Sequence, residues 1–191
     1  MKGFFAMLSR MKYIDRWGLM RSSRTETLCE HTLETALLTH ALIAIANERF
    51  DAGLSPGEGV LYALYHDAPE IITGDLPTPV KYHNEGIREA YRAIEEQAAN
   101  RLLEMLPAPL QGSFAPYFSD GGLYGPYVKA ADKLSALIKC IEERNAGNRE
   151  FFEAERACRA HPSLALPAAQ VFLEEFLPAY SLTLDEVGSF D

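Results

Sequence analysis

The chain has 191 residues, 48% of them hydrophobic, and a formal net charge of −9. This length and apolar content suit one domain with a sizeable core, which we expect to span residues 1–191. The acidic balance disfavours a protein that coats nucleic-acid polymers or binds membranes through a basic surface, although a small anionic substrate needs only a local basic cluster.

The cysteines indicate the compartment. They are Cys29, Cys140 and Cys158, an odd number at wide spacing, which is typical of a reducing environment rather than of a disulfide framework. The apolar run at the amino terminus is too short for a signal peptide, and no stretch reaches the ~18 apolar residues of a membrane helix. We therefore expect a cytoplasmic protein without membrane contact.

Apolar residues recur with helical spacing in nearly every long segment, and no hairpin signal is present, which predicts an all-α fold. The first helix should carry residues 4–14. A polar loop with Arg16, Arg21 and Arg24 follows. Such a loop is usually only solvated. The alternative is an anion-binding edge, because arginine matches phosphate oxygens with two parallel hydrogen bonds.

Capping signals mark the next helices. Thr27 and Glu30 form a capping box, which predicts a helix to about Arg49, and Ser55 with Pro56 starts the helix that should carry His66 and Asp67. Further helices are expected over about 84–106, 126–144, 149–160 and 167–176. Between them, residues 74–79 should form a stiff loop, and 107–125 should be loop-rich and the most mobile stretch, with 119–125 as a candidate lid.

The central stretch is His66-Asp67-Ala68-Pro69-Glu70, at the end of an apolar run. It delivers polar groups into the interior, where they are costly unless paired or bound to a metal. Imidazole and carboxylate are good ligands for divalent transition ions, and Glu70 follows the pair at helical-neighbour spacing. The alternative is a helix-end cap formed by Asp67, with His66 satisfied in the core. This stretch alone does not decide between the two.

Two residues elsewhere strengthen the metal interpretation. His31 lies in the first turn of its predicted helix, and Asp132 lies beside the apolar stripe of another. Together with His66 and Asp67 they would suit an octahedral ion with two positions left for water or substrate. His40 is not on the face of His31, and we expect it to be an ordinary, partly exposed histidine.

The order His, then His-Asp, then Asp resembles the HD-domain metal-dependent phosphohydrolases, and the flanking residues resemble the bacterial HD-domain 5′-deoxynucleotidases. The similarity covers most of the chain, and its most specific part is the run Gly-Asp-Leu-Pro-Thr-Pro at residues 74–79. The matching segments are Arg16-Trp17, Arg24-Thr25-Glu26, Glu30-His31, Tyr65-His66-Asp67, Glu70, residues 73–82, 129–132 and 182–186.

The resemblance implies an HD-domain helical bundle with a buried metal site and an enzyme that removes the 5′-phosphate from deoxyribonucleoside 5′-monophosphates. It also implies a homodimer and one divalent transition ion, commonly cobalt, manganese or copper. The residue roles it implies are listed by function: His31, His66, Asp67 and Asp132 as metal ligands; Glu70 and Arg16 as catalytic residues, acting on water and orienting the phosphate; and Arg16, Trp17, His31, Asp67, Asp75, Leu76, Pro77 and Thr78 as substrate contacts.

Elementary chemistry agrees with these roles. A divalent ion lowers the pKa of water and polarises a phosphoryl oxygen, and Arg16 adds a fixed cation. A 2′-hydroxyl pressed against the apolar wall of Trp17 would lose its hydrogen bonds to water, which favours deoxy sugars. The alternatives are an HD-type enzyme for another phosphoester, such as a cyclic nucleotide or a sugar phosphate, and a nucleotide-sensing module without turnover. The complete ligand set argues against the sensor.

Overall fold

The computed structural model of the chain describes residues 2–81 and 83–188, except for the side chain of Thr78. In these ranges the chain folds into helices joined by short loops, and the only β-type pairing is an isolated antiparallel bridge between Asp15 and Thr27. The all-α prediction is therefore confirmed. No helix of the described part is long and apolar enough to span a membrane.

The helices differ greatly in length, and the longest ones form the frame of the molecule. In chain order the elements are α1 (Phe4–Leu8), η1 (Ser9–Tyr13), α2 (Leu28–Phe50), α3 (Pro56–Tyr65), α4 (Glu70–Thr73), α5 (Thr78–Lys81), α6 (Glu85–Glu104), α7 (Ala108–Phe114), η2 (Ala115–Phe118), α8 (Gly125–Asn145), η3 (Arg149–Phe151), α9 (Phe152–Arg159), η4 (Pro162–Ala165), α10 (Pro167–Glu175), η5 (Leu177–Ser181) and α11 (Leu184–Val187), where η marks a 3₁₀ helix.

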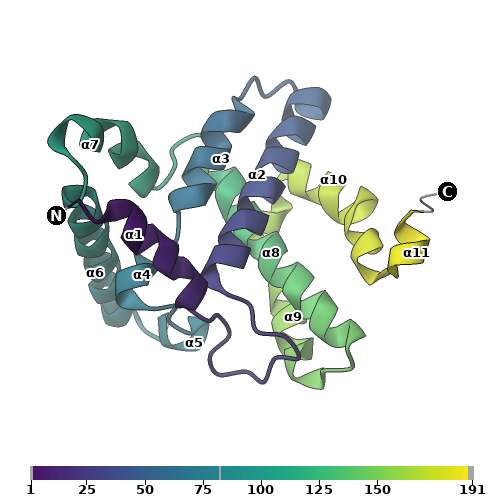
Figure 1. Ribbon diagram of the computed structural model, residues 1–191. Coiled ribbons are helices and arrows are strands. Elements are labelled where there is room, and N and C mark those ends of the chain that lie inside the picture. Colours follow the sequence, from purple (N-terminus) through teal and green to yellow (C-terminus); the bar gives the residue numbers. More distant parts are fainter. Residues whose placement is uncertain (1, 82, 189–191) are drawn as a thin grey trace.

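Helix α2 is central and packs against α3, α8 and α10 (Figure 1). The larger core cluster lies between α2, α8 and the C-terminal helices, and Leu42, Leu134 and Leu137 in it are fully buried. A second cluster lies under α1 and α6 and includes Phe4 and Leu102. Because α2 belongs to both halves of the molecule, its first turn is held rigidly between them.

The capping signals place the helix starts correctly. The hydroxyl of Thr27 accepts from the backbone N–H of Glu30, whose carboxylate in turn accepts from the N–H of Thr27. This reciprocal pair satisfies two of the donors that a helix start leaves free. At the start of α3, the hydroxyl of Ser55 accepts from the backbone N–H of Glu58, which is one half of such a pair. The orientation of the first turn of α2 therefore follows directly from local sequence.

The predicted helix that carries His66 and Asp67 ends earlier than expected. Helix α3 stops at Tyr65, and both residues lie in the turn that leads to α4. Pro69 has no N–H to continue a helix and disfavours helical backbone before it, so the chain turns here, as its position predicted. This turn lets two adjacent side chains share one site.

Two loop predictions were wrong. Residues 107–125 contain α7 and η2, because the prolines near their starts fix helical φ rather than interrupting a helix. The rings of Phe114 and Phe118 then pack on Phe4, with centroids 5.3 and 6.2 Å away. The expected stiff loop at 74–79 is also shorter, because α5 begins at Thr78. The lid role of 119–125 stays a prediction.

The contact between α2 and α3 depends on Gly59. A Cβ at this position would lie 2.1 Å from Cδ1 of Ile43, which is fully buried. We expect Gly59→Ala to lower the free energy of unfolding by on the order of 1 kcal/mol, because overpacking costs ~1–3 kcal/mol and exceeds the gain of ~1 kcal/mol in helix propensity. Urea unfolding measures the change.

Two further variants test that cause. Ile43→Val removes Cδ1 and with it the steric clash. The double variant Gly59→Ala/Ile43→Val should therefore lose less stability than the two single variants lose together. Gly57 lies on the same helix, and a Cβ there would make only an ordinary contact with Oγ of Ser55, at 3.9 Å, so Gly57→Ala should be neutral or slightly stabilising. Equal losses at both glycines would contradict the packing explanation.

Candidate metal centre and adjoining cavity

The predicted ligands converge on one site. His31 comes from the first turn of α2, and His66 and Asp67 come from the turn after α3. One ligand atom from each of these three side chains lies within 4.8 Å of the other two. Asp132, on the second turn of α8, joins through His31, whose Nε2 lies 3.3 Å from its Oδ1. The structure thus brings together residues from three separate segments, as expected.

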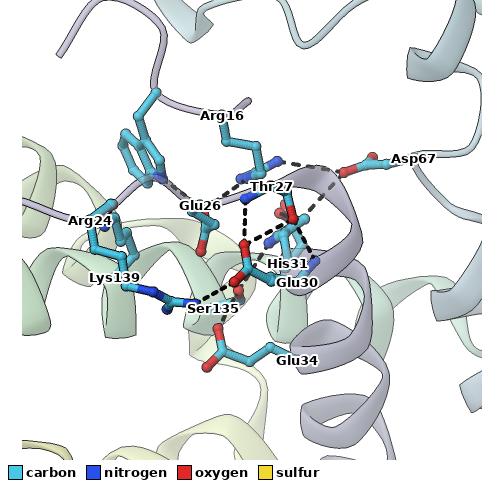
Figure 2. Close-up of polar contacts among 12 residues, drawn as sticks. Arg16, Arg24, Glu26, Thr27, Glu30, His31, Glu34, Asp67, Ser135 and Lys139 are labelled. Carbon is cyan, nitrogen blue, oxygen red and sulfur yellow. Dashed lines mark hydrogen bonds and ion pairs between the residues drawn. The ribbon is translucent and has the colours of Figure 1, made fainter. Parts of the chain in front are cut away.

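The hydrogen bonds of His31 fix its tautomer. Ser135 is fully buried on α8 and donates its hydroxyl hydrogen to Oε2 of Glu34, at 2.6 Å. Its oxygen lies 2.9 Å from Nδ1 of His31 and must therefore accept from Nδ1–H. Figure 2 shows Glu34, Ser135 and His31 in this sequence. The lone pair of Nε2 is left facing the site.

His66 is oriented by the backbone in the same sense. Its Nδ1 lies 2.7 Å from the carbonyl oxygen of Ala63, which can only accept, so Nδ1 carries the hydrogen. The Nε2 atoms of His31 and His66 are both buried and have no hydrogen-bond partner among the described residues. Two orphaned lone pairs pointing at one carboxylate are a good fit to a metal ion.

Electrostatics show the same need for a cation. Nε2 of His66 lies 3.1 Å and Nε2 of His31 3.4 Å from the same oxygen of Asp67, Oδ2. Burial alone would lower the pKa of His66, but the adjacent Asp67 carboxylate raises it to about 9. Burial would raise the pKa of Asp67, but the two histidines hold that pKa well below its usual range. Without a metal, protons occupy the place that a cation would take.

Arg16 and Trp17 flank this cluster on the loop before α2. Nη1 of Arg16 lies 3.7 Å from Oδ2 of Asp67 (Figure 2). The guanidinium Nε and the indole Nε1 of Trp17 both donate to one oxygen of Glu26, at 3.1 and 2.9 Å. Trp17 also has a left-handed backbone, with φ of 62°. That conformation is strained for a bulky residue and persists only where the surroundings enforce it.

The loop is fastened to α8 by a buried ion pair. Glu143 forms an ion pair with Lys139 and accepts from the backbone N–H of Ser23 at 2.8 Å. Lys139 donates to the carbonyl of Arg24 at 2.6 Å. The predicted anion-binding edge is therefore reduced to Arg16, because Arg24 pairs with Glu30 at the surface and Arg21 pairs with Glu150 in the same way.

Glu70 lies behind the cluster, at the start of α4. It is 5% exposed, its Oε2 has no partner among the described residues, and its Oε1 lies 3.8 Å from Nζ of Lys81. Burial and the nearby carboxylates of Asp67 and Asp75 raise the pKa of Glu70 to about 9. At neutral pH a carboxyl group with that pKa keeps its proton, and a cation beside it would lower the pKa and free the carboxylate to accept a proton.

A cavity of about 620 Å³ opens beside the cluster. Most of the predicted substrate contacts line it, and its far wall is formed by small residues of α9. The side chain of Thr78, one of the predicted contacts, lies outside the described part of the structure. His40 was not predicted to be a contact and is exposed, as expected. The cavity lining comprises Arg16, Trp17, Gly18, Leu19, Met20, Asp75, Leu76, Pro77, Pro79, Lys133, Ala136, Glu153, Ala154, Ala157, Cys158 and His161.

Sequence reasoning missed the residues that hold the site in place. Ser135, Glu34 and Glu26 make the hydrogen bonds described above, yet none was singled out as functional. The signal was available for two of them. Glu34 lies one helical turn after His31, and Ser135 one turn after Asp132, so both share a face with a predicted ligand.

Comparisons with known proteins match nearly the whole chain. A family model described as 5′-deoxynucleotidase YfbR-like matches residues 3–180. A 5′-deoxynucleotidase of Erwinia tasmaniensis is 47% identical, with 97% of this chain and 96% of that protein covered, and one of Yersinia pestis is 46% identical, with 98% of each covered.

Two solved structures share the fold. An HD-domain phosphohydrolase from Listeria innocua superimposes with a TM-score of 0.80 at 25% identity, covering 93% of this chain and 87% of that one. The cyanophage S-2L HD phosphohydrolase DatZ, bound to dA and one catalytic zinc ion, superimposes with a TM-score of 0.60 at 20% identity, covering 91% and 95%.

The anchor of the Arg16 loop makes a pH-dependent contribution to stability. Burial would raise the pKa of Glu143, but hydrogen bonds from Lys139 and Ser23 lower it to about 2. A group whose pKa is lower in the folded state stabilises the fold above its unfolded pKa of ~4.3, and this contribution is lost as pH falls toward ~2. Wild-type stability should therefore decline over that interval.

Glu143→Gln removes the titrating group, so its free energy of unfolding should be lower at neutral pH and should change less between pH ~4.5 and ~2. Urea unfolding at a series of pH values measures both effects. The matched control is Glu142→Gln, which alters the exposed neighbour on the same helix. Parallel pH profiles for wild type and Glu143→Gln would contradict this assignment.

Proposed function

Because the chain belongs to the YfbR-like 5′-deoxynucleotidase family, we propose that it hydrolyses deoxyribonucleoside 5′-monophosphates at the centre formed by His31, His66, Asp67 and Asp132. Its enzyme class is that of the family, a phosphoric monoester hydrolase. The observation that carries the residue assignment is the meeting of two orphaned imidazole nitrogens with Asp67 beside a cavity.

His31, His66, Asp67 and Asp132 would hold a divalent ion, which when bound would supply positive charge to lower the pKa of water and polarise a phosphoryl oxygen. Arg16 is held by Glu26 with its guanidinium directed to Asp67, so it orients the phosphate at the same place and stabilises charge on its oxygens. Glu70 removes a proton from the attacking water or holds that water in line with phosphorus. Glu70 is buried, its Oε2 has no partner among the described residues, and it lies outside the group of three close ligand atoms, which supports a proton-transfer role over a further ligand.

The cavity accounts for the rest of the substrate. Trp17 forms a rigid wall for the sugar, and Asp75, Leu76 and Pro77 line the same cavity. The apolar side chains of Leu19, Met20 and Ala157 in the cavity lining make no hydrogen bond to a base, so contact with them should allow several bases. Thr78 completes the proposed substrate contacts, together with His31 and Asp67.

The remaining proposals concern the state of the protein in the cell. We propose a single HD-type domain over 1–191 that acts as a homodimer in the cytoplasm, with cobalt, manganese or copper as the ion. The free thiols of Cys29, Cys140 and Cys158 support a reducing compartment. The mixed nitrogen and oxygen donor set supports a transition ion over calcium or magnesium.

The function is tested by phosphate release. Protein stripped with a chelator should release no phosphate from any nucleotide, and added cobalt or manganese should restore release from deoxyribonucleoside 5′-monophosphates in preference to ribonucleotides. The same panel should include a 3′-monophosphate, a cyclic nucleotide and a sugar phosphate. Preferred turnover of one of the last two would favour the alternative phosphoesterase, and nucleotide binding without phosphate release would favour a sensor.

Glu70→Ala and Asp67→Ala separate a catalyst from a ligand. Glu70→Ala should keep its ion and its nucleotide affinity but turn over at least ~10²-fold more slowly, the low end of the range for general base catalysis. Asp67→Ala should lose the ion as well. Titration with cobalt and phosphate release at saturating nucleotide measure the two effects. Loss of the ion in both variants would make Glu70 a ligand, and full activity in Glu70→Ala would pass its role to another group such as Asp75.

Trp17→Ala tests the sugar wall. We expect the ratio of kcat/KM for deoxy over ribo monophosphates to fall by an amount equivalent to ~1–3 kcal/mol, the range for small steric differences in a pocket. Trp17→Phe keeps an aromatic wall and should preserve most of the ratio. The ratio is the relevant readout because Trp17 also packs on Phe151, with ring centroids 5.2 Å apart. An unchanged ratio in Trp17→Ala would mean that the indole serves only packing.

A further inference from the structure

The metal-facing side of His31 depends on a chain of two hydrogen bonds behind it. Nδ1 of His31 contacts Oγ of Ser135 at 2.9 Å, and Oγ of Ser135 contacts Oε2 of Glu34 at 2.6 Å. His31 and Ser135 are both fully buried, so water cannot replace the bond between them. The three residues come from two helices, α2 and α8, which are packed along the core.

The direction of this chain follows from donor counting. A carboxylate has no hydrogen to give, so the single hydroxyl hydrogen of Ser135 goes to Glu34. The hydroxyl oxygen is then an acceptor for Nδ1–H of His31. Glu34 thus sets the direction in which Ser135 donates its hydroxyl hydrogen, and Ser135 sets the tautomer of His31. A serine without Glu34 could instead donate to Nδ1 and leave the hydrogen on Nε2, where it would block a ligand bond.

We propose that Ser135 and Glu34 are positioning residues for the metal ligand His31, which they hold in the Nδ1–H tautomer and in a fixed ring orientation. This inference rests on the metal site proposed above. Partners behind a ligating histidine raise its basicity and restrict its rotation, and their removal typically weakens metal binding by ~10–100-fold. The negative charge of Glu34 acts through Ser135, not through a direct contact with the ion.

The test is the cobalt affinity of purified full-length protein, measured by calorimetry without substrate. Ser135→Ala should bind cobalt ~10–100-fold more weakly than wild type. Glu34→Ala should also weaken binding. Because Glu34 acts through Ser135, the double variant should bind about as weakly as Ser135→Ala, within the ~2-fold error of such cycles. Binding that weakens by the product of the two single effects, or wild-type affinity in Ser135→Ala, would overturn the proposal.

Thr35→Val is the matched control. Thr35 is buried on α2, and its hydroxyl has no hydrogen-bond partner among the described residues, so the change removes a buried hydroxyl outside the chain of bonds. Cobalt affinity should stay at the wild-type value. If Ser135→Ala does not fold in thermal unfolding of the metal-free protein, Glu34→Ala still tests the inference, because Glu34 is only partly buried.

The tautomer gives a readout that does not depend on activity. In protein loaded with zinc, which is diamagnetic, ¹H–¹⁵N spectra should show a slowly exchanging Nδ1–H of His31 in wild type and in Thr35→Val. Exchange should be faster in Ser135→Ala. Equal protection in all three would contradict the assigned bond. Failure of the underlying metal site is a separate result, in which wild type binds no ion or His66→Ala keeps it.

Discussion

The structure depends on holding like groups together against their mutual repulsion. Two imidazole nitrogens and a carboxylate oxygen present lone pairs to one another within 4.8 Å, an arrangement that no folded protein keeps without a positive charge between them or a stiff frame around them. The frame is visible here. Ala63 holds the ring of His66, and Ser135 holds that of His31. The fold therefore keeps the cluster in place, and a cation, either a proton or a metal ion, makes it favourable.

Helix α8 supplies most of that frame from a single face. Asp132, Ser135, Lys139 and Glu143 follow one another at spacings of three or four residues and so form a polar column along the helix. The first of these faces the metal centre, the second the ligand His31, and the last two hold the Arg16 loop. The opposite side of the same helix carries Leu134 and Leu137 into the core. The packing of α8 thus sets the positions of the proposed ligand Asp132, of the hydrogen-bond partner of His31 and of the loop that carries Arg16 at once.

Much of this could be predicted from sequence, for reasons that differ between elements. Helix starts were predictable because capping is local, as at Thr27, and Pro69 marked the turn that presents the His-Asp pair. Residues 107–125 were mistaken for loop because prolines there start helices, and the aromatic contacts with Phe4 that stabilise them are distant in sequence. The meeting of His31, His66 and Asp67 was predictable because few roles suit a buried histidine beside an aspartate. Glu34 and Ser135 were not, because ordinary residue types acquire their role only when α2 and α8 pack together.

The bridge between Asp15 and Thr27 closes the Arg16 loop at its base, directly before the helix that carries His31. Residues near the bridge are fixed by it and by Glu26, whereas Leu19 is 70% exposed at the cavity mouth. The entropic cost of lengthening a closed loop is small, ~0.6 kcal/mol for each doubling. Insertions or substitutions around Leu19 can therefore reshape the entrance with little thermodynamic penalty, while the distance between Arg16 and the metal centre stays constant. The loop separates a variable mouth from an invariant reaction centre, which gives the scaffold room to diversify in the ligands it admits.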